Sequence, residues 1–186
     1  DMVAGASCAP VTDYFSYANR LVTVAAGLTT ADTYGSCDAC VLGCTDPLAN
    51  NYDATATTDD GSCLFTATFN VDMNCEDPTT YSTVHLESAY FGCFTGCTQM
   101  SDPEMDGIYS VTVDIPGGDF VYFYSIDNNS SREDLVDDMV NGETCAPVTD
   151  YFSYANRLVS ATSGINTSDT YGSCIACIAG CTDPLA

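Results

Sequence analysis

An acidic loop between two cysteines is the segment whose residue types and spacing point most directly to chemistry. Residues 43–63 read GCTDPLANNYDATATTDDGSC, with Cys44 near the start and Cys63 at the end. The loop is rich in side-chain oxygens and has almost no apolar residues, so it cannot fold by burying surface. A cation with roughly six to eight oxygen ligands would order it, and this favours Ca²⁺ over Mg²⁺, which keeps more of its water. The alternative is a flexible acidic linker.

The cysteine content points to a disulfide framework. The chain has 12 cysteines and one histidine in 186 residues. An even number of clustered cysteines indicates disulfides and an oxidising, extracellular setting, whereas a zinc protein would need histidines or paired C-x-x-C units. A Cys44–Cys63 disulfide would close the acidic loop and stabilise it by about 3 kcal/mol. The Cys37-x-x-Cys40 motif lacks the βαβ context of a redox enzyme.

A second acidic segment offers a weaker metal site. Residues 102–107 read DPEMDG, which matches the opening of an EF-hand loop through Asp102, Glu104 and Asp106. Position 12 of that loop would be Val113 rather than glutamate, which breaks the pattern. We therefore favour an acidic turn here, with a calcium site as the alternative.

The charge balance excludes several classes of partner. There are 26 acidic residues against three arginines, for a formal net charge of −23. Nucleic acids require a basic surface, and an anionic membrane would repel this chain. No apolar run approaches the roughly 20 residues of a membrane span, so we expect no membrane insertion. Divalent cations would offset the self-repulsion of so many carboxylates.

The chain repeats itself. Residues 1–49 align without gaps on residues 138–186 at an offset of 137, with 36 of 49 positions identical. Because the last residues break off inside the acidic-loop motif, we expect the chain to belong to a longer tandem array. One period carries eight cysteines. Cys93 and Cys97 are close enough for a local bridge, and three pairings stay open among the remaining four, which are Cys8, Cys37, Cys40 and Cys75.

Several segments alternate apolar and polar residues, as β-strands do. These are residues 65–73 and 109–115, with shorter signals at 84–86 and 157–160. Residues 116–118 read Pro-Gly-Gly, a turn signal, and the dense aromatic run 120–126 predicts a buried strand. No segment reads as an amphipathic helix. We predict an all-β fold, an antiparallel β-sandwich of residues 64–179. Residues 1–42 would be the second half of a preceding sandwich, 43–63 a loop module, and 180–186 the start of the next module.

Two resemblances extend this interpretation. The 43–63 segment resembles the GCTDPxAxNYxxxAxxDDGSC repeat of surface proteins from Bacteroidota, which is akin to thrombospondin type 3 calcium repeats. That resemblance implies a calcium-binding, disulfide-closed loop module whose ligands are Asp46, Asn51, Asp53, Asp59 and Asp60. Residues 68–73, 106–113, 120–126 and 172–177 resemble immunoglobulin-like domains related to starch- and glycogen-binding modules. This second resemblance implies an immunoglobulin-like sandwich.

Carbohydrate binding is not carried over with that resemblance. Such modules grip sugars on exposed tryptophans, and this chain has none. Phe94 or Tyr90 could stack on a sugar, although a core or interface role is favoured. Asn128, Asn129 and Asn166 lie in N-x-S sequons and are candidate glycosylation sites.

A structural role is the favoured function. Arg20 and its repeat equivalent Arg157 lie among many carboxylates, so we expect a buried or interface ion pair. The sequence has no Gly-x-Ser-x-Gly, no His-Glu-x-x-His and no catalytic Cys/His pair, and we predict that it is not an enzyme. We predict a subunit of an extracellular fibril or stalk, stiffened by calcium and disulfides, that associates head-to-tail with further copies. The alternative is a carbohydrate-binding module or adhesin repeat.

Overall fold

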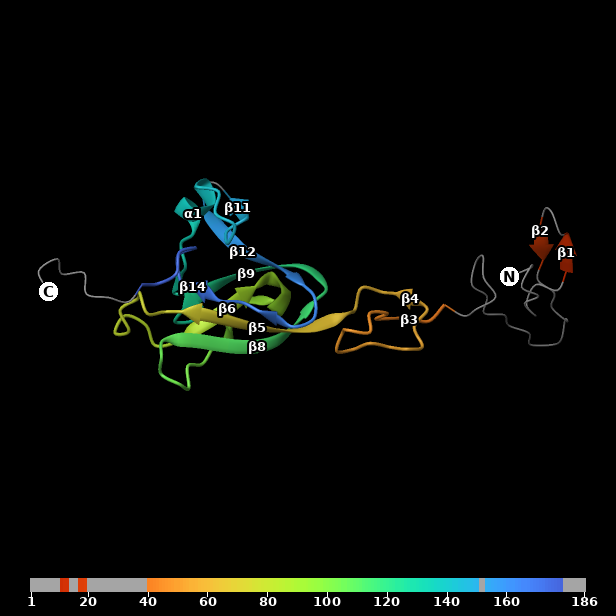
Figure 1. Cartoon of the computed structure of the whole chain (residues 1–186), viewed down its shortest axis with the longest axis horizontal. Coiled ribbons are helices and arrows are strands. Elements are labelled where there is room, and N and C mark those ends of the chain that lie inside the picture. The colour runs from red at the N-terminus through yellow and green to blue at the C-terminus, as the bar shows by residue number, and fades with distance from the viewer. Residues whose placement is uncertain (1–10, 14–16, 20–39, 151–152, 179–186) are drawn as a thin grey trace, which may run out of the picture.

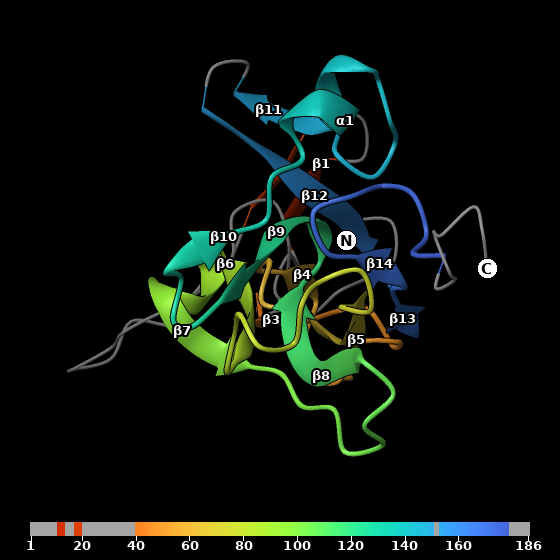
Figure 2. The same cartoon turned by 90° about the vertical axis from the view of Figure 1, so that its left-hand side faces the viewer.

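Two β-sheets pack face to face and form a sandwich that begins at residue 64 (Figures 1 and 2). The computed structural model describes residues 11–13, 17–19, 40–150 and 153–178. The fold is all-β, as the sequence predicts, and the short helical pieces are peripheral.

The larger sheet has the strand order β11-β12-β9-β6-β7, and β10 pairs with β9. All its pairings are antiparallel. Its strands are β6 (Val84–Ser88), β7 (Cys93–Gln99), β9 (Gly118–Ile126), β10 (Ser131–Arg132), β11 (Val148–Asp150) and β12 (Tyr154–Ala161).

The smaller sheet is built around β5 (Leu64–Asp72). Its long antiparallel partner is β8 (Ile108–Pro116), in a register that runs from Leu64↔Pro116 to Asp72↔Ile108. On the other edge of β5 lie β13 (Ile165–Asn166) and β14 (Asp169–Thr170), which run parallel to it. These two parallel pairings depart from a purely antiparallel sandwich. Both short strands belong to one extended segment along the β5 edge, and between them the Thr167 N–H donates to Thr68 O.

The core lies between the sheets, where the alternation of the predicted strands places apolar side chains. The inward residues of β5 are all buried, and Phe69 packs edge-on to Tyr122 of β9 with ring centroids 4.8 Å apart. The remaining core side chains come from both sheets: Phe65, Ala67, Val71, Met73, Val84, Leu86, Ile115, Phe120 and Tyr124.

Two short helical turns accompany the strands, although no segment of the sequence reads as an amphipathic helix. The 3₁₀ turn Ala89–Phe91 follows β6, and the helix α1 (Val136–Val140) follows β10. Asp134 accepts a hydrogen bond from the Val136 N–H, and Met139 packs into a small second core with Leu135, Ala146 and Ala155. A five-residue helix is too short to show a helical period in the sequence. Neither helical turn in the described ranges approaches the length and apolarity that a membrane-crossing helix requires.

A hairpin near the N-terminus repeats one in the sandwich. Strands β1 (Val11–Asp13) and β2 (Tyr17–Asn19) pair antiparallel, with Val11 opposite Asn19. In the sandwich, β11 and β12 pair with Val148 opposite Asn156. Every partner in the two hairpins differs by the repeat offset of 137, so the identical sequences adopt the same strand register.

Candidate functional site

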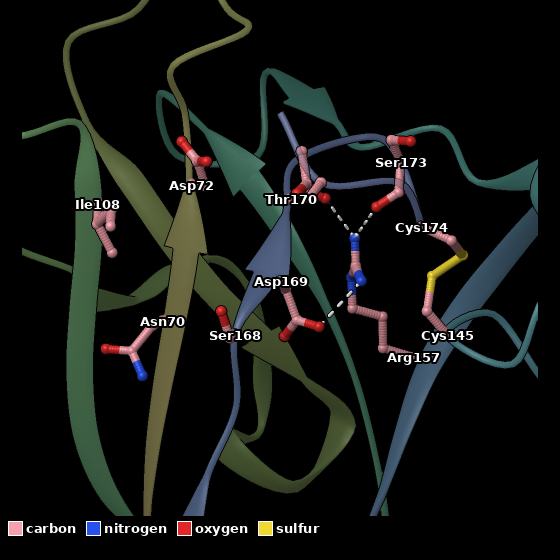
Figure 3. A pocket seen from close by; sticks show the side chains of 11 residues that line it. Asn70, Asp72, Ile108, Cys145, Arg157, Ser168, Asp169, Thr170, Ser173 and Cys174 are labelled. Atoms are coloured by element: carbon pink, nitrogen blue, oxygen red, sulfur yellow. Dashed lines mark hydrogen bonds and ion pairs between the residues drawn. A yellow bond between two sulfur atoms is a disulfide. The ribbon is translucent and has the colours of Figure 1, made fainter. Parts of the chain in front are cut away.

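Arg157 on β12 is the largest fully buried side chain in the described part of the chain (Figure 3). Its Nε donates to the two carboxylate oxygens of Glu133 at 3.1 and 3.2 Å, and its Nη2 donates to Glu133 Oε2 at 2.8 Å. Nη1 donates to Asp169 Oδ1 at 3.1 Å. Nη2 also reaches the carbonyl oxygens of Thr170 and Ser173. The ion pair expected at Arg157 is confirmed, and it is buried.

The two carboxylates that face Arg157 have further donors. Glu133 accepts the N–H of Tyr124 at 2.8 Å and that of Gly172 at 3.3 Å. Asp169 Oδ2 accepts the hydroxyls of Tyr122 and Tyr124 at 3.0 and 2.8 Å. One arginine neutralises only one of the two carboxylates. These hydrogen bonds stabilise the remaining negative charge, which would otherwise be costly to bury.

Burial and charge shift the pKa values of this cluster. Burial alone would lower the pKa of Arg157, but Glu133 and Asp169 more than offset it and raise that pKa above its ordinary value. Burial, together with the negative charge of Asp169, raises the pKa of Tyr122 and Tyr124 well above 10. At neutral pH the arginine is therefore charged and both tyrosines keep their protons.

Two disulfides hold the chain around this cluster. Cys145–Cys174 lies beside Arg157 (Figure 3), and Cys75–Cys177 joins the loop after β5 to the chain after β14. Cys145, Cys174 and Cys177 are the repeat equivalents of Cys8, Cys37 and Cys40. The sandwich therefore adopts one of the three pairings that the sequence left open. The side chains of Cys93 and Cys97 lie outside the described residues, and so does the side chain of Phe94.

A half-open cavity of about 220 Å³ adjoins the Arg157 cluster. Asn70, one of its lining residues, has its amide committed to Asn166 Oδ1 and Thr167 O, both at 2.7 Å, and accepts from Ser110 Oγ. The polar groups here bind one another. The arrangement is suited to fixing β5, β9, β12 and β14 together, and this is a structural role.

The 43–63 segment is an ordered module with little apolar core. A Cys44–Cys63 disulfide closes it, between the pair of residues that the sequence nominates. Strands β3 (Leu42–Gly43) and β4 (Thr58–Asp59) pair parallel across its base. Cys44 and Cys63 are buried, whereas most of the loop between them is exposed. Hydrogen bonds and the disulfide thus order the module.

The five candidate calcium ligands are used inside local turns. Asp46, Asp53, Asp59 and Asp60 each accept the N–H two residues further along the chain, at 2.8–2.9 Å. Asn51 donates to Ser62 O and accepts from the Leu64 N–H. Hydrogen bonds from Thr55 and Ser62 lower the pKa of Asp53 and of Asp60, respectively. Across the described ranges, no three acidic, histidine or cysteine side chains gather as a metal site would require. The turn geometry does not by itself form a calcium cage.

The second acidic segment is a turn, the interpretation that the sequence favours. Asp102 accepts from the N–H groups of Asp106 and Gly107, and Asp106 accepts from the Ile108 N–H. Both carboxylates thus support the loop between β7 and β8. Glu104 is exposed on the same loop.

The sequon asparagines occupy one turn and one edge strand. Asn128 and Asn129 have positive φ values of 58° and 63° in the turn between β9 and β10. Asn166 lies on β13 and accepts from Asn70. Tyr90 is 49 % exposed and packs edge-on against Phe91. Glycosylation of these asparagines stays a prediction.

Sequence reasoning found Arg157 but missed its partners. Asp169 belongs to the Asp-Thr-Tyr-Gly-Ser-Cys block that recurs as residues 32–37, and this recurrence was the available signal. Glu133 has no repeat equivalent in the chain. Glu133 lies between Arg132 and Asp134, and such a run of mixed charges in a sequence is typical of an exposed turn.

Comparison with known proteins adds no identity. Neither a scan against protein-family models nor a search of curated proteins finds a match to this chain.

Proposed function

We propose that this chain is a structural module of an extracellular tandem-repeat fibril or stalk, in which the 43–63 module is a stiff connector between sandwiches. Three disulfides within the described residues support an oxidising compartment. The 137-residue repeat supports a tandem arrangement, because repeated units that contact their neighbours form rods.

The junction between the connector and the sandwich carries this proposal. No linker separates them, since β5 begins at the residue after Cys63. The Asn50 N–H donates to Leu64 O at 2.8 Å, and its side-chain amide donates to Thr66 and Asp114 at 2.6 Å. Asn51 binds the residues on either side of Cys63, because it donates to Ser62 O and accepts from the Leu64 N–H. Two adjacent asparagines therefore tie the module to β5 and β8, which restrains bending at the junction.

Calcium binding by Asp46, Asn51, Asp53, Asp59 and Asp60 is a separate part of the proposal. It is supported by the density of oxygen side chains in a disulfide-closed loop. The stiffness argued from Asn50 and Asn51 does not depend on an ion. Addition of Ca²⁺ to chelator-treated protein, followed by calorimetry, tests this part by itself.

The connector role is tested by replacing Asn50 and Asn51 with alanine in the full chain. We expect faster proteolysis within residues 43–63 and a wider spread of angles between module and sandwich in small-angle scattering. Asn74→Ala, which removes an amide from a different loop, is the matched control. If the double variant matches the wild type in both measurements, the junction is not what stiffens the chain and the connector proposal fails.

A further inference from the structure

A hollow on the outer face of the larger sheet contains an arginine that forms no direct ion pair with a described residue. Arg132 of β10 forms no ion pair with any described residue, although the chain carries a net charge of −23. Val121 and Phe123 of β9 also line the hollow, on the face opposite the core-facing Tyr122 and Tyr124. Glu133 and Asp134 act on Arg132 only at longer range, and no described carboxylate is in direct contact with its guanidinium.

The Arg132 guanidinium is held in place with donor capacity to spare. It lies 3.8 Å from the ring centroid of Phe123 and 4.9 Å from that of Tyr154. Its Nη2 donates to Ala155 O at 2.8 Å and to Asn156 Oδ1, while its Nε is buried without a partner. Contacts with two aromatic rings fix its orientation. The group is positioned to receive an anion that the described chain does not supply.

The hollow is large and mainly apolar. Its volume is about 400 Å³, and two of its apolar side chains are partly exposed, Val121 at 37 % and Tyr154 at 42 %. An exposed apolar patch with a polar rim is typical of an interaction surface. Its chemistry suits an apolar side chain that lies next to a carboxylate. The residues that matter for this are Ser88, Val121, Phe123, Arg132, Tyr154 and Asn156.

The loop between β7 and β8 presents that combination. Met105 at its tip is 88 % exposed and has a φ of 56°, and Glu104 beside it is exposed as well. The hydrogen bonds that Asp102 and Asp106 accept fix the loop, so its tip is preformed. Methionine packs favourably on aromatic rings, and a carboxylate forms short, strong bonds with a guanidinium.

We propose that this loop docks into the Arg132 hollow of a second copy of the chain. Met105 would contact Phe123 and Tyr154, and the Glu104 carboxylate would pair with Arg132. The inference rests on the proposed function as a rod of tandem units, to which it adds a side-to-side contact between rods.

The positions of the two surfaces favour growth over closure. Both views show the loop before β8 projecting from the side of the sandwich opposite α1 and β11 (Figures 1 and 2). The hollow is lined by Arg132 of β10 and by Tyr154 and Asn156 of β12. The two surfaces lie apart on the sandwich, so in a pair that uses one loop and one hollow, one copy keeps a free hollow and the other keeps a free loop. Such heterologous contacts propagate, and they would bundle rods laterally.

The test is a charge swap in the oxidised full chain, followed by sedimentation and electron microscopy. The salt should be about 0.15 M, where repulsion between exposed charges is screened beyond roughly 8 Å. We expect Arg132→Glu and Glu104→Arg each to weaken self-association about tenfold or more, and the double variant to recover most of it. Glu143→Arg makes the same change of charge as Glu104→Arg, but outside both surfaces, and should not weaken association. Met105→Ser should weaken it without any change of charge.

Recovery in the double variant separates this contact from a folding defect, because Glu104→Arg would not restore a misfolded Arg132→Glu chain. A wild type that stays monomeric, or single variants that associate normally, would overturn the proposal. The competing occupant is an acidic glycan, for which polygalacturonate is the probe. If the wild type binds polygalacturonate and Arg132→Glu abolishes that binding while self-association is unchanged, the hollow serves an acidic glycan and the proposal fails. The connector test at Asn50 and Asn51 is independent of all these outcomes.

Discussion

Arg157 and Glu133 form an ion pair with 2.8 Å between Nη2 and Oε2, in which the two side chains are 2 % and 0 % exposed. Arg157 comes from β12, and Glu133 from the segment that joins β10 to α1. Removing two charges from water costs several kcal/mol, so the pair is tolerated only because Tyr124, Gly172 and Asp169 complete its hydrogen bonds. The cluster therefore fixes the positions of β12 and β14 in the sandwich.

Replacing Arg157 with methionine should destabilise the sandwich by about 3–5 kcal/mol. The cause is that Glu133 and Asp169 would remain as two unpaired negative charges in a buried site and would repel each other. Urea unfolding followed by far-UV circular dichroism measures this loss. Glu143→Gln, on an exposed residue, should stay within about 0.5 kcal/mol of the wild type. A decrease in the free energy of unfolding of less than about 1 kcal/mol for Arg157→Met would show that the cluster contributes little to the stability of the sandwich.

The disulfides should differ in what their removal unfolds. Cys75–Cys177 spans 102 residues and Cys44–Cys63 spans 19. In the chain-entropy model their losses cost about 4–5 and about 3 kcal/mol, respectively. We expect the Cys75→Ser/Cys177→Ser pair to lower the melting temperature of the sandwich. Cys44→Ser/Cys63→Ser should increase hydrogen exchange only within residues 43–63. Exchange that rises across β5 and β8 in the second variant would contradict a self-contained module.

The long strands were predictable from the sequence because each carries a clear alternation. β5, β8 and β9 have nine residues each and place apolar side chains on one face. β10, β13 and β14 have two residues each and no period to detect. Long-range contacts define them, including the Thr167 N–H bond to Thr68 and the ion pair of Asp169 with Arg157. The parallel pairing of β13 and β14 with β5 follows from the same contacts.

The candidate site was predictable to a similar degree. A lone arginine among carboxylates indicates an ion pair, but the partners of Arg157 lie 24 and 12 residues away and only folding selects them. The acidic loop has the opposite difficulty. An aspartate two residues before a free N–H can cap a turn or bind a cation with the same oxygen, and the sequence does not distinguish these uses.

Alkaline pH should unfold the sandwich through its buried tyrosines. The pKa values of Tyr122, Tyr124 and Tyr171 are raised, chiefly by burial, above the ordinary value of 10.0. Their contribution to stability is complete below pH 10 and is lost as the pH rises above it, because the unfolded chain releases these protons first. Absorbance at 295 nm should show most tyrosines titrating near pH 10 and a later group ionising only on unfolding. A single titration near pH 10 in the folded protein would contradict the buried cluster.

Acid should loosen the 43–63 module through the turns of Asp53 and Asp60. Their pKa values lie below the ordinary 3.8 because side-chain and backbone hydrogen bonds from Thr55 and Ser62 favour the carboxylates. A lowered pKa stabilises the folded state above pH 3.8, and that stability is lost as the pH falls through the lowered value. Protection of the module from an acid protease should thus hold at pH 5 and fall below about pH 4.

Thr55→Val removes the largest cause of the shift at Asp53, so it should move the loss of protection to a higher pH. Thr79→Val makes the same change at Asp77, outside the module, and should leave the midpoint in place. If Ca²⁺ binds these carboxylates, adding it should move the wild-type midpoint further down, because protons and the ion compete for the same oxygens. A midpoint that neither Thr55→Val nor Ca²⁺ moves would show that Asp53 supports neither the turn nor an ion.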